Sequence, residues 1–399
     1  MNNRDVVLTS FLAFVSSFEA TMILTAIPEI SAYFGITHFE ASFLVAIYVA
    51  IEALLFVPFA IVFERISLKI GMISGGVLLV IGGILIFFSS TFLEMEIFRV
   101  IQALGASIIM PTSLAYASSI GDDARRGHAI GINHTIVSLG YVIGLPIGGL
   151  IILFNWKILF LISSTLALII LIFILTVNDI KSVSTIGIKV LGPSLMLSGI
   201  VLLALNIWLA IAATLFGLVT SLRTTLPKEY VKSSISGFIH SITRNAFAAF
   251  LVFFYSRLGY TSLQYGLLIL LYPLSFTFVS LAAGKASDRF GRKLVSILGF
   301  VAMAIFSLSI FINSILAEIL LGMASGIATT SNTSYTMNSL EKENRIVGSA
   351  LRTLQGTVSM SLGLSLGSII SIVPENIVMI LVVLNFASVA IALFYKKEK

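Results

Sequence analysis

Long apolar runs separated by short charged segments make up most of the chain. Twelve of these runs are long enough to cross about 30 Å of hydrocarbon as a helix. They cover residues 6–30, 40–62, 70–90, 92–118, 128–153, 157–177, 234–256, 263–283, 294–312, 316–338, 348–372 and 377–394. The pattern predicts an all-α protein that crosses a membrane many times.

A further apolar segment lies in the middle of the chain. Residues 190–222 carry no charge. This segment is too long for one ordinary span and barely long enough for two short ones. Basic residues precede this segment at Lys181 and Lys189 and follow it at Arg223. The basic residues on both sides of the segment indicate that both of its ends lie on the cytoplasmic side of the membrane. We therefore predict a short helical hairpin that turns at Asn206. The total is then fourteen spans, with twelve as the alternative.

Composition places the chain among membrane proteins. It is 58% hydrophobic and 11% charged, with a mean hydropathy of +1.08. Soluble domains carry about a quarter of charged residues. There is no cysteine, which excludes disulfides, thiolate metal sites and thiol nucleophiles. The spacing of the four histidines does not fit a metal-binding site, and the sequence has no phosphate-binding loop motif. We therefore expect no enzymatic activity, no cofactor and no metal site.

The positive charges predict the orientation, since Lys and Arg accumulate in cytoplasmic loops. Most of the 24 fall in alternate loops, which we assign to the cytoplasm together with both termini, and the protein to the cell membrane. These cations are Arg4, Arg65, Lys69, Arg125, Arg126, Lys181, Lys189, Arg223, Lys228, Lys232, Lys285, Arg289, Arg292, Lys293, Lys342, Arg345, Lys396, Lys397 and Lys399. The net charge of +6 therefore indicates topology and contact with anionic lipid, not nucleic-acid binding.

A charged hinge between two spans repeats along the chain. Residues 284–293 hold five charges and two glycines, and residues 60–69 repeat the acid, the next Arg and the final Lys. The two acids, Glu64 and Asp288, lie 224 positions apart. This spacing predicts two related halves. We place them at residues 1–180 and 233–399, joined by a linker with the hairpin at 181–232.

The hinge resembles the loop motif G-x-x-x-D-R-x-G-R-K of the major facilitator superfamily. In that family the motif joins the second and third helices of each half, and it implies a role in conformational change. The matching residues of the second copy are Gly284, Asp288, Arg289, Gly291, Arg292 and Lys293. The first copy keeps only Glu64, Arg65 and Lys69.

Two further stretches resemble motifs of the same superfamily. Residues 99–105 resemble its fourth-helix motif R-x-x-Q-x-x-G, which is linked there to proton coupling. Residues 140–149 resemble the fifth-helix motif of its antiporters, through Gly140, Gly144, Pro146, Gly148 and Gly149. Close helix packing alone would also explain such a glycine stripe. The first run, from Glu19 to Pro28, is similar to that of the fourteen-span drug/proton antiporters.

Charges inside spans are costly unless they are paired or face water, so they are the candidate functional groups. Glu19 is our candidate proton carrier, because burial favours the neutral form of a carboxyl group. A permanent ion pair with Arg99 is the structural alternative. Glu52 is a second candidate or a structural acid, and Arg244 with His240, one turn apart, lines a cavity or packs near its mouth. We expect Glu94, Glu96 and Glu318, near outer helix ends, to be solvated.

The resemblance implies a proton-coupled exporter of small amphiphilic or cationic molecules. It would act as a monomer in the bilayer, alternating between two open states with the substrate held between its halves. A metabolite uniporter or symporter of the same fold is the alternative. A membrane receptor or scaffold is a remote one, since no sizeable soluble domain is available for signalling.

Overall fold

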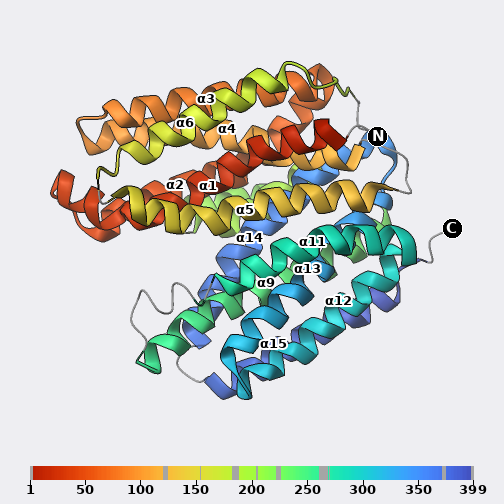
Figure 1. The fold of residues 1–399 in the computed structure, drawn as a ribbon. Coiled ribbons are helices and arrows are strands. Elements are labelled where there is room, and N and C mark those ends of the chain that lie inside the picture. The colour runs from red at the N-terminus through yellow and green to blue at the C-terminus, as the bar shows by residue number, and fades with distance from the viewer. Residues whose placement is uncertain are drawn as a thin grey trace.

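The computed structural model describes residues 3–119, 125–152, 154–181, 188–203, 205–221, 226–259, 268, 270–370 and 374–396. Throughout this part of the chain the secondary structure is helical and contains no strand, as the sequence predicts (Figure 1). The first helices are α1 (Asn3–Phe34), α2 (His38–Ile66), α3 (Leu68–Phe88), α4 (Phe92–Ser119), α5 (Arg126–Ile152) and α6 (Ile158–Ile174). They are followed by α7 (Leu191–Leu202), α8 (Ile207–Ser221), α9 (Lys228–Arg257), α11 (Leu271–Phe290), α12 (Arg292–Ser307), α13 (Ser314–Asn338), α14 (Arg345–Ile370) and α15 (Pro374–Leu393).

Helices α1–α6 form one bundle, and α9 with α11–α15 forms the other (Figure 1). The main packing pairs repeat between them, since α1 packs on α5 as α9 packs on α14. Gly144 of α5 lies against Phe18 and Thr21 of α1, and Gly363, 219 positions later, lies against Ile242–Ala246 of α9. Small residues let both helix pairs approach closely. The expected pseudo-symmetry of two six-helix halves is confirmed, while the exact boundaries stay a prediction.

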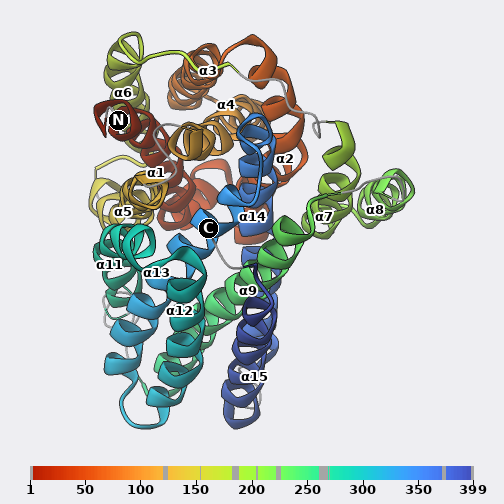
Figure 2. The same ribbon diagram turned by 90° about the vertical axis from the view of Figure 1, so that its right-hand side faces the viewer.

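Seven of the described helices are long and apolar enough to cross a bilayer, and four others are apolar but shorter. The shorter ones include α7 and α8, the predicted central hairpin, which lies beside α2 and α14 (Figure 2). Their turn falls at Asn206, whose Oδ1 accepts hydrogen bonds from the backbone N–H groups of Trp208 and Leu209. At about 18 and 22 Å, both helices are shorter than the hydrocarbon layer. Their crossing of the membrane stays a prediction.

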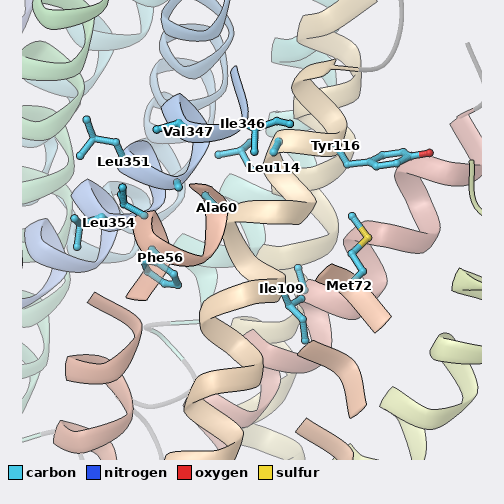
Figure 3. Close-up of a cluster of buried hydrophobic side chains, with 14 of the residues drawn as sticks. Phe56, Ala60, Met72, Ile109, Leu114, Tyr116, Ile346, Val347, Leu351 and Leu354 are labelled. Atoms are coloured by element: carbon cyan, nitrogen blue, oxygen red, sulfur yellow. The ribbon is translucent and has the colours of Figure 1, made fainter. Parts of the chain in front are cut away.

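The two bundles meet at the end of the molecule that holds both termini and diverge toward the opposite end (Figure 1). At the joined end, buried apolar side chains of α2 and α14 pack together, among them Phe56 and Ala60 against Leu351 and Leu354 (Figure 3). Burial of such side chains is worth about 1.5–3 kcal/mol each. This contact therefore stabilises the arrangement in which that end is closed.

Candidate functional site

Glu19 lies in the middle of α1 and is completely buried. Its Oε1 accepts hydrogen bonds from Gln102 Nε2 of α4, at 2.9 Å, and from the hydroxyl of Ser163 of α6. Its Oε2 has no hydrogen-bond partner in the described part of the chain. The carboxyl group is thus held by two neutral donors on one oxygen, while the other oxygen is free to carry a proton.

Arg99 does not pair directly with Glu19. Among the described residues, no ion pair within 4.0 Å joins the two, and Gln102 stands between them. Arg99 Nη1 donates to Gln102 Oε1 at 2.7 Å, and the Arg99 guanidinium lies 4.0 Å from the centroid of the Tyr48 ring. A chain of hydrogen bonds, Arg99 to Gln102 to Glu19, therefore replaces the direct ion pair that was the structural alternative.

The local sequence explains why these groups meet. Arg99 and Gln102 are three residues apart, which puts both on one face of α4. Gln102 packs against Gly82 and Gly83 of α3, and Gly105 packs against the backbone of Gly75. The glycines allow α3 and α4 to approach closely, and the polar side chains of α4 extend away, with Gln102 reaching Glu19 of α1 and Arg99 lying against Tyr48 of α2.

Glu52 and Tyr48 lie one turn apart on α2. Glu52 is 9% exposed, and its charge interacts with Arg99, as does the charge of Glu19. Tyr141 of α5 interacts electrostatically with both Glu52 and Arg244 of the other bundle. Glu19, Arg99 and Glu52 therefore belong to one interacting group of charges.

His240 and Arg244 lie on α9 and form no hydrogen bond with that group within the described residues. His240 is buried inside its own bundle, where Nε2 lies 3.3 Å from Thr329 Oγ1 and Nδ1 lies 3.5 Å from Asn385 Oδ1. Arg244 is half-buried, with its guanidinium 5.8 Å from the centroid of the Phe276 ring on α11. The two side chains thus have different neighbours, and a shared cavity-lining role stays a prediction.

The second loop motif joins the two bundles. Asp288, at the end of α11, accepts the backbone N–H of Gly127 at 2.9 Å and that of His128 at 2.8 Å. Arg292 Nη2 holds the same carboxylate at 3.0 Å. Gly127 and His128 begin α5 in the other bundle, and a helix N-terminus favours a negative charge. Asp288 therefore acts as a link between the halves at the closed end.

The remaining residues of the second loop motif each occupy a different structural position. Gly291 connects α11 to α12 with φ +94°, a conformation that only glycine adopts readily. Gly284 lies against the backbone of Gly127, which explains its lack of a side chain. Lys293 Nζ donates to the carbonyl groups of Leu393 and Tyr395 at the end of α15, and Arg289 is exposed.

The first copy of the motif repeats part of this geometry. Lys69 Nζ donates to the Leu175 carbonyl at 2.6 Å, just as Lys293 binds the end of the last helix in its own half. Ser67 stands where the second copy has Gly291, and its φ of 174° is extended backbone that needs no glycine. Glu64 is fully buried, whereas Arg65 is exposed.

The glycine stripe of α5 packs against the helix that carries Glu19. Gly140, Gly144 and Gly148 face α1, where an added Cβ would meet backbone or side-chain atoms. Gly149 has open space around it, and Pro146 is exposed within the helix. Three of the five motif residues thus hold α1 and α5 together.

Some participants were not predicted. Ser163 and Tyr48 sit in apolar runs, where a buried hydroxyl is the only sequence signal. Gln102 was recognised as a motif residue but not as the bridge between two charges. Glu318 was expected to be solvated, yet it is 1% exposed, because its helix end packs inside the second bundle.

Comparison with known proteins gives consistent matches. The family model described as Major Facilitator Superfamily matches residues 9–232 and 233–399. The riboflavin transporter RibZ of Clostridioides difficile (strain 630) is 25% identical over 329 residues, covering 73% of this chain and 69% of RibZ. The quinolone resistance protein NorB of Staphylococcus aureus (strain MRSA252) is 26% identical, covering 76% and 74%. The crystal structure of the human organic anion transporter MFSD10 superposes with a TM-score of 0.76 at 13% identity, covering 98% and 100%.

Proposed function

The chain belongs to the Major Facilitator Superfamily, and from this premise we propose that it is a proton-coupled exporter of small amphiphilic molecules. The protein is a multi-pass membrane transporter, and the proposal concerns its coupling ion, its direction and its substrates. The observation that carries the proposal is the buried carboxyl group of Glu19, with one oxygen unpartnered.

A carboxyl group buried in this way can exist in two states. As a neutral acid it fits its surroundings, because no cation within 4.0 Å among the described residues balances its charge. As a carboxylate it needs compensation, and Gln102 links it to the guanidinium of Arg99. Loss of the proton should therefore tighten the Arg99–Gln102–Glu19 chain, and uptake of a proton should relax it.

Movement of the two bundles would connect this switch to transport. The closed end is held by the hydrogen bonds that Asp288 of α11 accepts from the start of α5, and by the apolar contact between α2 and α14. Glu52 and Tyr48 lie on that same α2, so a change at Arg99 reaches the helix that must move. Protonation on one side and release on the other would then accompany rocking of the halves.

The named relatives support aromatic, amphiphilic substrates. RibZ is called a riboflavin transporter and NorB a quinolone resistance protein. A riboflavin transporter as relative also favours a second candidate function, uptake of a metabolite by symport or uniport. Opposite proton and substrate fluxes support export, parallel fluxes support symport, and no proton flux supports uniport.

The test is transport in proteoliposomes under an imposed pH gradient, with ethidium, riboflavin and a quinolone as trial substrates. Glu19→Gln mimics the protonated acid and cannot release a proton, so concentrative transport should fall to background while passive exchange survives. Glu96→Gln, on α4 outside the group, is the matched control and should behave as the wild type. Uphill transport by Glu19→Gln at the wild-type rate would remove Glu19 from the mechanism.

A further inference from the structure

Arg244 is a cation inside the molecule to which the described residues supply no counter-ion. Among them, no ion pair within 4.0 Å and no hydrogen bond involves Arg244. It lies near the middle of α9 and is half-buried. A guanidinium group always carries its charge and offers five N–H donors. With no partner among the described residues, these donors are available to a ligand.

The surroundings of Arg244 come from both bundles. Its charge acts on His134 and Tyr141 of α5 in the first bundle, and on Tyr272 of α11 in its own. The ring of Phe276, also on α11, has its centroid 5.8 Å from the guanidinium carbon. Arg244 therefore lies near the boundary between the two bundles, where its charge reaches residues of both.

A second arginine of the same bundle lies near enough to interact with Arg244. Arg352 of α14 interacts with Arg244, is buried, and likewise belongs to no ion pair among the described residues. The imidazoles of His134 and His240 lie in the same field. The acids of the transport site, Glu19 and Glu52, belong to the opposite bundle. A ligand with a negative group would therefore be attracted to the side of Arg244.

Aromatic side chains flank the same place. Phe276 lies beside the guanidinium, and Tyr141, 36% exposed, interacts electrostatically with both Arg244 and Glu52. Flat side chains of this kind bind planar ring systems, and an arginine fork binds a carboxylate in two parallel hydrogen bonds. An aromatic ligand that carries a carboxylate would match both features.

We propose that Arg244 binds the anionic group of the transported substrate, and that the substrates are small aromatic carboxylates whose rings lie against Phe276 and Tyr141. The inference rests on the proposed function, because it takes the substrate to occupy the space between the halves. It predicts anionic substrates, whereas the sequence led us to expect cationic ones. The competing explanation is that Arg244 pairs with Glu52 when the halves close further.

Binding to the full chain in lipid nanodiscs tests this, with radiolabelled 2-naphthoate as probe and empty nanodiscs as blank. Unlabelled 2-naphthamide and 2-naphthylmethylammonium serve as competitors of the same shape. The wild type should prefer naphthoate over both, and Arg244→Gln should weaken naphthoate binding by about 10- to 100-fold, the range of a charged hydrogen bond. Arg244→Lys should keep part of the affinity. Arg4→Gln, an exposed cation at the joined end, should change nothing.

Other results would overturn the proposal. These are equal affinity for the acid and the amide, stronger binding of the ammonium compound, or unchanged naphthoate binding in a folded Arg244→Gln protein. If Glu52→Gln reduced naphthoate binding as much as Arg244→Gln, Arg244 would act by pairing with Glu52 and not by binding the ligand. Binding does not depend on proton flux, so a failure here leaves proton-coupled export intact, and loss of coupling leaves the anion site intact.

Discussion

The N-terminal bundle links its interior charges, whereas the C-terminal bundle leaves its own apart. In the first, Glu19, Gln102 and Arg99 form a continuous hydrogen-bonded chain across α1 and α4. In the second, Arg244 and Arg352 are cations outside any described ion pair, and His240 bonds only to neutral groups. The helix packing repeats while the charges do not.

This difference suggests a division of labour. A buried acid linked to an arginine can lose its proton because the nearby cation compensates the carboxylate that forms, which suits coupling. An arginine that lacks a counter-ion suits ligand binding, because the ligand supplies the missing charge. A fold of two related halves could therefore separate the driving ion from the cargo, with α5 and α11 between them.

The largest effect is expected at Arg99. Arg99→Ala removes the cation that favours the charged form of Glu19, so proton release should require a higher pH and the pH optimum of transport should move upward. The rate should fall at least about tenfold, because charged hydrogen bonds contribute about 1.5–3 kcal/mol. Initial rates in proteoliposomes across a pH series measure both. Arg244→Gln should leave the optimum in place, and an equal shift in both variants would contradict the division.

The link at the closed end should show the next largest effect. Asp288→Asn removes the charge that binds the start of α5 and Arg292, so the closed state should lose stability and transport should fall severalfold. Glu64→Gln should also weaken transport, since Glu64 is the buried acid at the same place in the first copy of the motif. Insertion, measured by membrane content, should be unchanged. Wild-type rates in both variants would mean that these acids are only loop charges.

The glycine stripe offers a comparison within one helix. Gly144→Ala places a methyl group against Thr21 and Phe18 of α1, and such overpacking costs about 1–3 kcal/mol. Gly149→Ala meets no atom within 4 Å and should be neutral. Thermal unfolding of the two purified variants measures the difference. Equal melting temperatures would show that α1 and α5 can separate freely at Gly144.

The smallest effect is expected in the central hairpin, which neither half repeats. A cysteine replacing Asn206 in this cysteine-free chain should leave transport unchanged and react with a membrane-impermeant maleimide added from outside. A cysteine replacing Ser67, at the start of α3, should react only from the cytoplasmic side or not at all. Labelling of Asn206→Cys only from the cytoplasm would rule out fourteen spans.

Much of the candidate site followed from the sequence. An acid or arginine in an apolar run is conspicuous, so Glu19, Arg99 and Arg244 could be selected without coordinates. Their partners could not be predicted. Gln102, Ser163 and Tyr48 meet these charges only because α1, α2, α4 and α6 pack together in the folded protein. The burial of Glu318 was missed for the same reason, since distance from a helix end says little about what covers a side chain.

The sequence by itself determined the class of protein, the helical spans, the two halves and the motif residues, because hydropathy and charge act locally and repeat along the chain. The tertiary structure alone decided which charges meet. It placed a glutamine between Glu19 and Arg99, bound Asp288 to the first residues of α5 in the other half, and left Arg244 outside any ion pair of the described residues. These contacts depend on side chains from helices far apart in the chain, and no local pattern records them.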